Sequence, residues 1–205
     1  MSIILLLLRL PILVVHILVG LFTILFFPKE PKNFKNSHYR IMMLWMNILS
    51  SILGIKIDIR GIPDQSANLF VSNHVTYLDI IIINKLLPVN FIAKEEISSW
   101  PVIGRLASKT GTLFIKRGDN VESSKMIYEM EERFKLQNKI VFFPEGKIGN
   151  GKRVRKFHYK LFKSIENKEL YIQPIAIRYP SGYPINNNYS CLLYTSDAAD
   201  EGLGV

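Results

Sequence analysis

The fold is decided at residues 69–79, which read LFVSNHVTYLD. The first four residues indicate a short strand, and the polar turn after them leads into a second apolar run at residues 80–83. Thr76 is placed to cap a new helix, in which Asp79 occupies the third position and reaches back to the cap. The sequence therefore predicts a strand, a turn that carries His74, and a helix that carries Asp79.

His74 and Asp79 are candidates for a general base and its orienting partner. Positions five apart on one continuous helix diverge by roughly 140°, so we expect His74 in the turn and only Asp79 in the helix. In that geometry the carboxylate accepts one ring N–H and leaves the other nitrogen free to take a proton from a substrate hydroxyl. The alternative is a surface histidine beside a helix-capping aspartate, because this pair alone is not specific.

Size and composition favour one membrane-associated domain. The 205 residues suffice for a sizeable core. Hydrophobic residues make up 48%, and 26 Lys and Arg against 17 Asp and Glu give a net charge of +9, a combination that suits an anionic lipid surface. We expect no nucleic-acid partner, because no recognition motif accompanies the charge. The single Cys191 excludes a disulfide framework and a cysteine-ligated metal site, and we expect no metal.

Residues 3–27 predict a membrane-anchoring helix. The run is apolar except for Arg9, Pro11, His16 and Thr23. As a helix it measures roughly 37 Å, enough to cross a hydrocarbon core of about 30 Å with Arg9 reaching toward one surface. A cleavable signal peptide is the alternative, but no basic leader precedes the run and no small-residue cleavage site follows it. The flank is basic, so the positive-inside rule places the catalytic domain at the cell membrane on the cytoplasmic side.

Two elements are predicted before residue 61. Residues 41–53 carry apolar side chains at helical spacing, and this helix either lies in the membrane interface or packs on the domain core. Gly54 ends it. Residues 55–60 alternate between apolar and polar, which predicts a half-buried strand.

From residue 68 short apolar strands alternate with helical stretches. Strands are expected at 69–72, 89–93, 112–115, 139–143 and 171–177, with helical segments after Asp79, Lys94 and Asp119 and around His158. This order predicts an α/β fold, a single domain with a largely parallel sheet flanked by helices. The helix after Asp119 has Glu122 as its capping partner and places Met126, Met130 and Phe134 in the core.

Polar blocks follow three further strands. They read GTLFIKR at 111–117, VFFPEG at 141–146 and IQPIAI at 172–177. Together with NHVTYLD at 73–79, and in this order, they resemble the blocks of the glycerolipid acyltransferase family, which includes the 1-acylglycerol-3-phosphate acyltransferases. The resemblance covers roughly residues 41–179.

The resemblance implies a role for each matching residue. His74 is the catalytic base and Asp79 its partner. The residues implied to bind substrate include Asn73 in the first block, and Lys94 and Arg117 near the acceptor's anionic head. Glu145 and Gly146 would shape the acceptor site. Pro174 would belong to the acyl-side wall. A salt-bridged surface residue is the alternative for Lys94.

The third block departs from the family pattern. It commonly continues with Thr-Arg, and here Lys147-Ile148 stands in that place. Lys147 supplies charge without the bidentate fork of an arginine. The departure therefore affects the predicted identity of the acceptor more than the predicted type of reaction. The basic run at 147–160 either holds the domain against anionic lipid or is a solvated loop.

These features predict an enzyme that moves a fatty acyl group from acyl-CoA or acyl carrier protein to 1-acylglycerol-3-phosphate, giving phosphatidate. The thioester is already activated, so no cofactor is needed beyond this co-substrate. The alternatives are acylation of another lyso-lipid such as lyso-ornithine lipid, and a non-catalytic membrane-bound lipid-binding protein. Lipid-ester hydrolysis is disfavoured, because no Gly-x-Ser-x-Gly elbow is present.

The chain divides into four predicted segments. Residues 1–28 form the membrane anchor, 29–60 a basic linker with the amphipathic helix and first strand, and 61–190 the catalytic domain, truncated at its C-terminus. Residues 191–205 are predicted to be a sequencing artefact, because residues 191–201 resemble translated adapter and carry no Lys or Arg.

Overall fold

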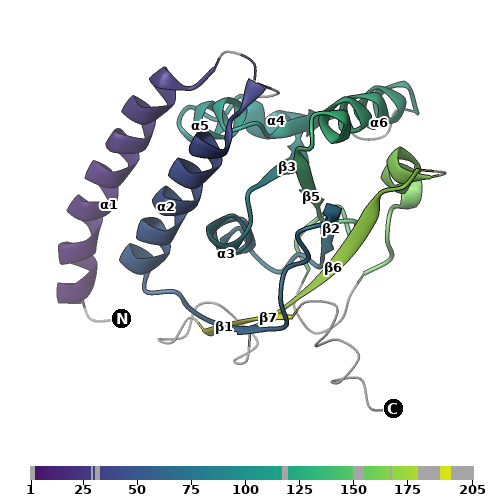
Figure 1. Cartoon of the computed structure of the whole chain (residues 1–205). Coiled ribbons are helices and arrows are strands. Elements are labelled where there is room, and N and C mark those ends of the chain that lie inside the picture. Colours follow the sequence, from purple (N-terminus) through teal and green to yellow (C-terminus); the bar gives the residue numbers. More distant parts are fainter. Residues whose placement is uncertain are drawn as a thin grey trace, which may run out of the picture.

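A seven-stranded sheet forms the centre of the fold, in the order β1-β7-β6-β2-β5-β3-β4 (Figure 1). The structure is a computed structural model that describes residues 3–28, 30, 33–116, 120–149, 155–166, 168–179 and 190–194. The strands are β1 (Lys56–Arg60), β2 (Ala67–Ser72), β3 (Val89–Lys94), β4 (Leu113–Ile115), β5 (Lys139–Phe142), β6 (Tyr171–Arg178) and β7 (Ser190–Tyr194).

The predicted parallel sheet is confirmed. Strands β6, β2, β5, β3 and β4 run parallel to one another. Strands β7 and β1 run in the opposite direction, because β7 pairs antiparallel with β6 and parallel with β1. The carboxyl ends of β2, β5 and β6 therefore meet at one edge of the sheet, where catalytic turns of α/β proteins gather.

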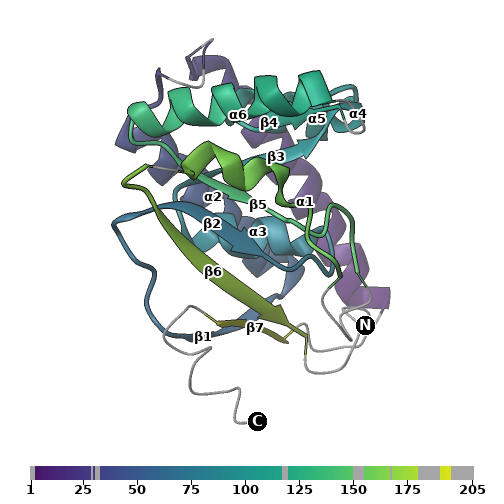
Figure 2. The same ribbon diagram turned by 90° about the vertical axis from the view of Figure 1, so that its right-hand side faces the viewer.

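Helices cover both faces of the sheet. They are α1 (Ile3–Thr23), η1 (Ile24–Phe26), α2 (Asn36–Leu53), α3 (Leu78–Leu86), α4 (Glu95–Ser98), α5 (Ile103–Lys109), α6 (Asn120–Lys135) and η3 (Tyr159–Ile165). In Figure 1, α1, α2 and α3 follow one another from the outside toward the sheet. Figure 2 shows α6 and η3 in front of the strands, on the other face.

The core is divided into two layers by the alternation of side chains along the strands. Phe70 of β2 and Val141 of β5 pack with α3 on one face. Leu69 and Ile140 pack on the other face, against α6. The predicted core positions of α6, Met126, Met130 and Phe134, are buried there. Burial on both faces explains why the central strands read as continuous apolar runs.

Helix α1 packs along α2. Residues Leu7–Phe26 are long and apolar enough to cross a membrane, with a mean hydropathy of 2.3. The His16 ring stacks on Trp45 at 4.5 Å between centroids, and the Trp45 Nε1–H donates to the His16 carbonyl at 3.2 Å. Gly20 allows this approach, because a Cβ there would lie 2.7 Å from Trp45 Nε1. Arg9 donates to the Leu53 carbonyl at 3.4 Å, near the end of α2.

Helix α2 begins at Asn36, five residues before the predicted start. It packs on α3 and buries Leu49 and Ser50, so the alternative of packing on the domain is confirmed. Three apolar residues of α2 remain exposed on another side, namely Ile41, Leu44 and Ile48. Gly54 ends the helix as predicted, in the left-handed region at φ 71°.

A buried polar cluster joins α2 to the sheet. The Tyr39 hydroxyl donates to Asn90 Oδ1 at 2.9 Å and lies 3.0 Å from the Asn138 amide. Tyr39 is 8% exposed. Burial raises the pKa of Tyr39 to about 12, against the opposing effects of Arg133 and the Asn90 hydrogen bond. The hydroxyl is therefore neutral in the folded protein well above the pH at which it ionises in the unfolded chain.

This pKa difference predicts a loss of stability in alkali. The contribution of Tyr39 is fully present below pH 10 and is lost as the pH rises toward 12, because the unfolded chain ionises first. We expect urea unfolding in detergent to show a smaller decline between pH 9 and 11 for Tyr39→Phe than for the natural protein. At pH 8 the variant should be less stable by about 1 kcal/mol, from the lost hydrogen bond. Equal declines in both proteins would contradict this role.

Candidate active site

The turn after β2 is anchored to β6 by Asn73. Its Nδ2–H donates to the Ile177 carbonyl at 2.9 Å, and its Oδ1 accepts the Ile177 N–H at 2.7 Å. The side-chain amide thus continues the pairing of the two strands beyond the end of β2. Asn73 positions the turn through these two bonds, and its predicted contact with substrate stays a prediction.

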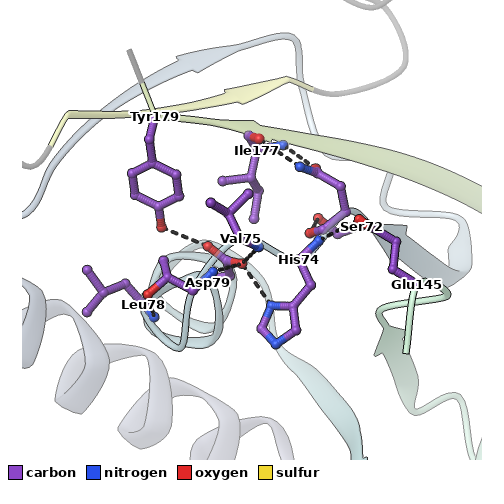
Figure 3. A network of polar contacts seen from close by, with 10 residues as sticks. Ser72, His74, Val75, Leu78, Asp79, Glu145, Ile177 and Tyr179 are labelled. Carbon is purple, nitrogen blue, oxygen red and sulfur yellow. Dashed lines mark hydrogen bonds and ion pairs between the residues drawn. The ribbon is translucent and has the colours of Figure 1, made fainter. Parts of the chain in front are cut away.

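His74 and Asp79 lie together as the spacing predicts. His74 is in the turn, Asp79 is in the first turn of α3, and His74 Nδ1 lies 2.8 Å from Asp79 Oδ2 (Figure 3). The carboxylate also accepts the Val75 N–H at 2.7 Å and the Thr76 N–H at 3.0 Å through the same oxygen. Helix α3 starts at Leu78, with Tyr77 rather than Thr76 at its N-cap position, and the Asp79 carboxylate reaches back to the Thr76 N–H as the capping pattern predicts.

The His74 imidazole is held at its edge by Asp79 and on its face by Phe143. The Phe143 ring stacks on it at 4.0 Å between centroids, with 12° between the planes. The His74 side chain is 12% exposed, whereas the Asp79 side chain is fully buried. Because Nδ1 carries the hydrogen toward Asp79, the lone pair lies on Nε2, which points away from Asp79 in Figure 3. The ring is thus oriented to accept a proton at Nε2.

Glu145 joins the His74 turn to the basic loop. It follows β5, is 3% exposed, and its Oε1 accepts the His74 N–H at 3.0 Å. Its Oε2 accepts the Arg155 N–H at 2.9 Å. Gly146 makes the turn possible with φ 73°, and its N–H donates to the Phe143 carbonyl at 3.0 Å. The acidic side chain therefore acts here through two backbone contacts.

The basic loop also touches the catalytic turn directly. The Gly149 N–H donates to the His74 carbonyl at 2.6 Å. Lys147 lies two residues before this contact and is exposed. The His74 amide is thus held by Glu145 of the third block and the His74 carbonyl by Gly149 of the segment that departs from the family pattern, which brings that segment to the edge of the site.

Three other residues were predicted to bind substrate. Lys94 is the exposed last residue of β3 and caps α4. Pro174 lies in the middle of β6, in register with Val71, at an exposed position. Arg117 lies outside the described residues. The substrate contacts of all three stay predictions.

The sequence patterns assigned no role to two residues of the site, Phe143 and Tyr179. Phe143 was quoted only as part of a block, and Tyr179 was given no role. The Tyr179 hydroxyl donates to Asp79 Oδ1 at 2.7 Å (Figure 3). The available signal was the alternation along β6, which buries Gln173, Ile175 and Ile177 and places Tyr179 on the same side.

Ser72, two residues before His74, is not placed as a nucleophile. It is 2% exposed, and its hydroxyl donates to the Asn73 carbonyl at 3.0 Å. Among the described residues no three His, Cys, Asp or Glu side chains are grouped as ligands for a metal ion. The arrangement suits a base that deprotonates a hydroxyl, with neighbours that fix the orientation of its ring.

Comparison with known proteins identifies the family. The model of the Acyltransferase family matches residues 56–178, which hold the whole His74 turn, Asp79 and Glu145. The chain belongs to the Acyltransferase family. This membership confirms the resemblance carried by the four blocks.

Relatives of the Acyltransferase family with two different acceptors resemble the chain. A lyso-ornithine lipid O-acyltransferase of Pseudomonas aeruginosa is 34% identical over 68% of this chain and 54% of its own length. A 1-acyl-sn-glycerol-3-phosphate acyltransferase of Neisseria meningitidis is 30% identical over 68% of this chain and 55% of its own length. The chain thus spans about half the length of the curated relatives that it matches.

A solved structure of the family shares the fold. The crystal structure of the 1-acyl-sn-glycerophosphate acyltransferase PlsC from Thermotoga maritima superimposes with a TM-score of 0.69. The match covers 94% of this chain and 82% of that chain, at 18% identity. The single α/β domain is therefore the architecture of a known acyltransferase.

The two contacts of Glu145 lead to a prediction about stability. Glu145→Gln keeps the size of the side chain but replaces one acceptor oxygen by a donor that faces a backbone N–H. We expect the variant to be less stable by about 1–3 kcal/mol, and amide exchange to accelerate at His74 and Arg155. Hydrogen exchange measured by mass spectrometry checks this, with the exposed Glu96→Gln as control. Unchanged exchange at both amides would show that Glu145 does not join the two segments.

Proposed function

We propose that the protein transfers a fatty acyl group from a thioester of coenzyme A or acyl carrier protein to the free hydroxyl of 1-acylglycerol-3-phosphate, giving phosphatidate. The observation that carries the proposal is the contact of 2.8 Å between His74 Nδ1 and Asp79 Oδ2, which directs Nε2 toward a substrate. Family membership and the relatives named above support acyl transfer to a lyso-lipid.

The reaction needs one base and no acyl group attached to the enzyme. His74 Nε2 takes the proton of the acceptor hydroxyl while the oxygen attacks the thioester carbonyl. The tetrahedral intermediate then collapses, the carbon–sulfur bond breaks, and the imidazolium returns the proton to the departing thiolate. Asp79 stabilises the positive charge that His74 carries between these two steps. Direct attack is favoured because Ser72 is buried and hydrogen-bonded away from His74.

The charge of the basic loop supports a phosphate-bearing acceptor. Lys147, Arg155 and Lys156 are exposed, and the segment is tied to His74 through Gly149 and Glu145. A phosphate monoester carries about −1.5 to −2 charges at pH 7, whereas the head group of lyso-ornithine lipid carries one carboxylate and one ammonium. Three exposed cations on a segment whose backbone contacts His74 and Glu145 therefore favour the phosphate.

Lyso-ornithine lipid is the second candidate acceptor. It is supported by the relative from Pseudomonas aeruginosa and by a second lyso-ornithine lipid O-acyltransferase, from Rhodobacter capsulatus, which is 36% identical over 64% of this chain and 49% of its own length. It is also supported by the missing arginine of the third block, where Lys147 offers no bidentate contact to a phosphate.

Membrane attachment through α1 suits either lipid acceptor. The helix exposes large apolar side chains along its length, among them Leu10, Val15 and Phe22. In this proposal α1 anchors the protein in the cell membrane, and the basic residues Lys35 and Arg40 keep the catalytic domain on the cytoplasmic side. The acceptor then reaches His74 without leaving the lipid phase completely.

A competition experiment tests the acceptor. The full chain in vesicles is given acyl-CoA with equal amounts of 1-acylglycerol-3-phosphate and lyso-ornithine lipid, and both products are quantified by mass spectrometry. We expect a higher kcat/KM for the phosphate acceptor, and we expect Lys147→Gln to lower that value but not the value for lyso-ornithine lipid. Lys135→Gln, at the far end of α6, is the matched control. Faster acylation of lyso-ornithine lipid would overturn the proposed acceptor.

A further inference from the structure

The Asp79 carboxylate has a second side that faces away from His74. Its Oδ2 serves three donors of the catalytic turn, His74 Nδ1, the Val75 N–H and the Thr76 N–H. Its Oδ1 accepts the hydroxyl of Tyr179 at 2.7 Å, and the hydrogen bond is buried. Figure 3 shows Asp79 between the two rings, with His74 on one side and Tyr179 on the other.

Tyr179 reaches Asp79 from a distant part of the chain. It follows β6 and is separated from Asp79 by 100 residues in the sequence. The side chain is 7% exposed and belongs to the core cluster that contains Ile82 and Ile83 of α3. The aromatic ring is therefore fixed by packing, and the hydroxyl is presented to the carboxylate in one position. A group held in this way restricts rotation of the carboxylate about its Cβ–Cγ bond.

We infer that Tyr179 is a positioning residue for proton transfer, holding Asp79 so that one oxygen meets His74 Nδ1. The inference rests on the proposed function, in which His74 is the base. Tyr179 acts through Asp79, because its buried hydroxyl donates to the carboxylate rather than to His74. The chain thus places three side chains in series, with Tyr179 donating to Asp79 and Asp79 accepting from His74.

Removing the Tyr179 hydroxyl takes one hydrogen bond from the Asp79 carboxylate and changes how strongly that carboxylate attracts the His74 ring. Asp79 Oδ1 is fully buried and would be left without this donor in Tyr179→Phe. A carboxylate that is less satisfied by hydrogen bonds attracts a protonated imidazole more strongly. We therefore expect the acid limb of the kcat/KM profile to move to higher pH in Tyr179→Phe.

The rate is expected to fall moderately. The carboxylate of Tyr179→Phe samples more orientations, so fewer molecules hold Nε2 toward the acceptor. Loss of one hydrogen bond in a charged network corresponds to a fall in kcat of about tenfold. KM should change by less than about twofold, because the hydroxyl is buried against Asp79 and acts on the rate through it.

The test compares Tyr179→Phe with Tyr171→Phe in the full chain. Tyr171 lies at the other end of the same strand and is 61% exposed, so its variant controls for the loss of a tyrosine hydroxyl from β6. The pH profile of kcat/KM, kcat at saturation and the melting temperature are measured for both. The inference is overturned if Tyr179→Phe transfers acyl groups as fast as the natural protein and the acid limb of its kcat/KM profile does not move.

A second readout does not depend on activity. The proton between His74 Nδ1 and Asp79 gives a downfield NMR resonance, which should shift or broaden in Tyr179→Phe and remain in place in Tyr171→Phe. An unchanged resonance overturns the inference even if the variant is unstable. If the natural protein shows no acyl transfer, the proposed function fails, while the resonance still reports whether Tyr179 positions the pair.

Discussion

Replacing His74 by alanine is expected to lower kcat for acyl transfer by about 10²–10⁴-fold, the usual contribution of a positioned general base. The fold should survive, because the turn is held by backbone contacts to Glu145 and Gly149 that do not involve the imidazole. KM for the acceptor should change little, since the base acts on the hydroxyl during the reaction rather than on the bound head group.

The matched control for this variant is His38→Ala, which removes an imidazole from the start of α2. Its Nδ1 accepts the Lys35 N–H, so a small loss of stability is expected without loss of acyl transfer. Acyl transfer is followed with a labelled thioester and the lyso-lipid acceptor in vesicles. If His74→Ala transfers acyl groups at the natural rate, the imidazole is not the base.

Substitution of Asp79 by asparagine should have an effect of similar size on kcat for a different reason. The amide fits the space of the carboxylate and can keep an oxygen toward His74 Nδ1. It carries no charge, so the imidazolium that forms during the reaction is no longer stabilised. We expect kcat to fall by about 10²–10⁴-fold and the stability to change modestly.

Asp79→Ala distinguishes the role of Asp79 in catalysis from its role in stabilising the fold. This variant leaves the Val75 and Thr76 N–H groups and the Tyr179 hydroxyl without their buried acceptor. Each such group costs about 1–3 kcal/mol, so the melting temperature should fall far below that of Asp79→Asn. Combining His74→Ala with Asp79→Asn should cost hardly more than the larger single effect, because the two residues act as one unit. Additive losses would contradict that coupling.

The local part of the site was predictable from the sequence. His74 and Asp79 are five positions apart, so the geometry of one turn and one helix start brings them together without any knowledge of the strand order. The alternation of apolar strands and helical stretches likewise indicated the parallel sheet. The helix core positions Met126 and Met130 followed from spacing alone.

Contacts between distant segments were not predictable. Tyr179 meets Asp79 across 100 residues, and Tyr39 meets Asn138 across 99. Both contacts depend on which strands are neighbours and on their register, and an apolar strand pattern specifies neither. The helix that carries Asp79 starts one residue later than its capping pattern indicated, although the predicted bond from the Asp79 carboxylate back to the Thr76 N–H is present.

Strand β7 was not predicted either. The segment Ser190–Tyr194 pairs with β1 and β6 at the edge of the sheet. Its sequence carries no turn or alternation signal that would assign it to this sheet. The adapter-like origin of residues 191–205 stays a prediction, which the nucleotide sequence around Cys191 would test.

The most direct test of acyl transfer to a lyso-lipid is its stoichiometry. The full chain in vesicles is incubated with a labelled acyl thioester and the lyso-lipid acceptor, and released thiol and acylated lipid are measured together. The mechanism at His74 predicts one acylated acceptor for each thiol released, and no thiol release above background when the acceptor is omitted. Thiol release with free fatty acid and no acylated lipid would contradict it.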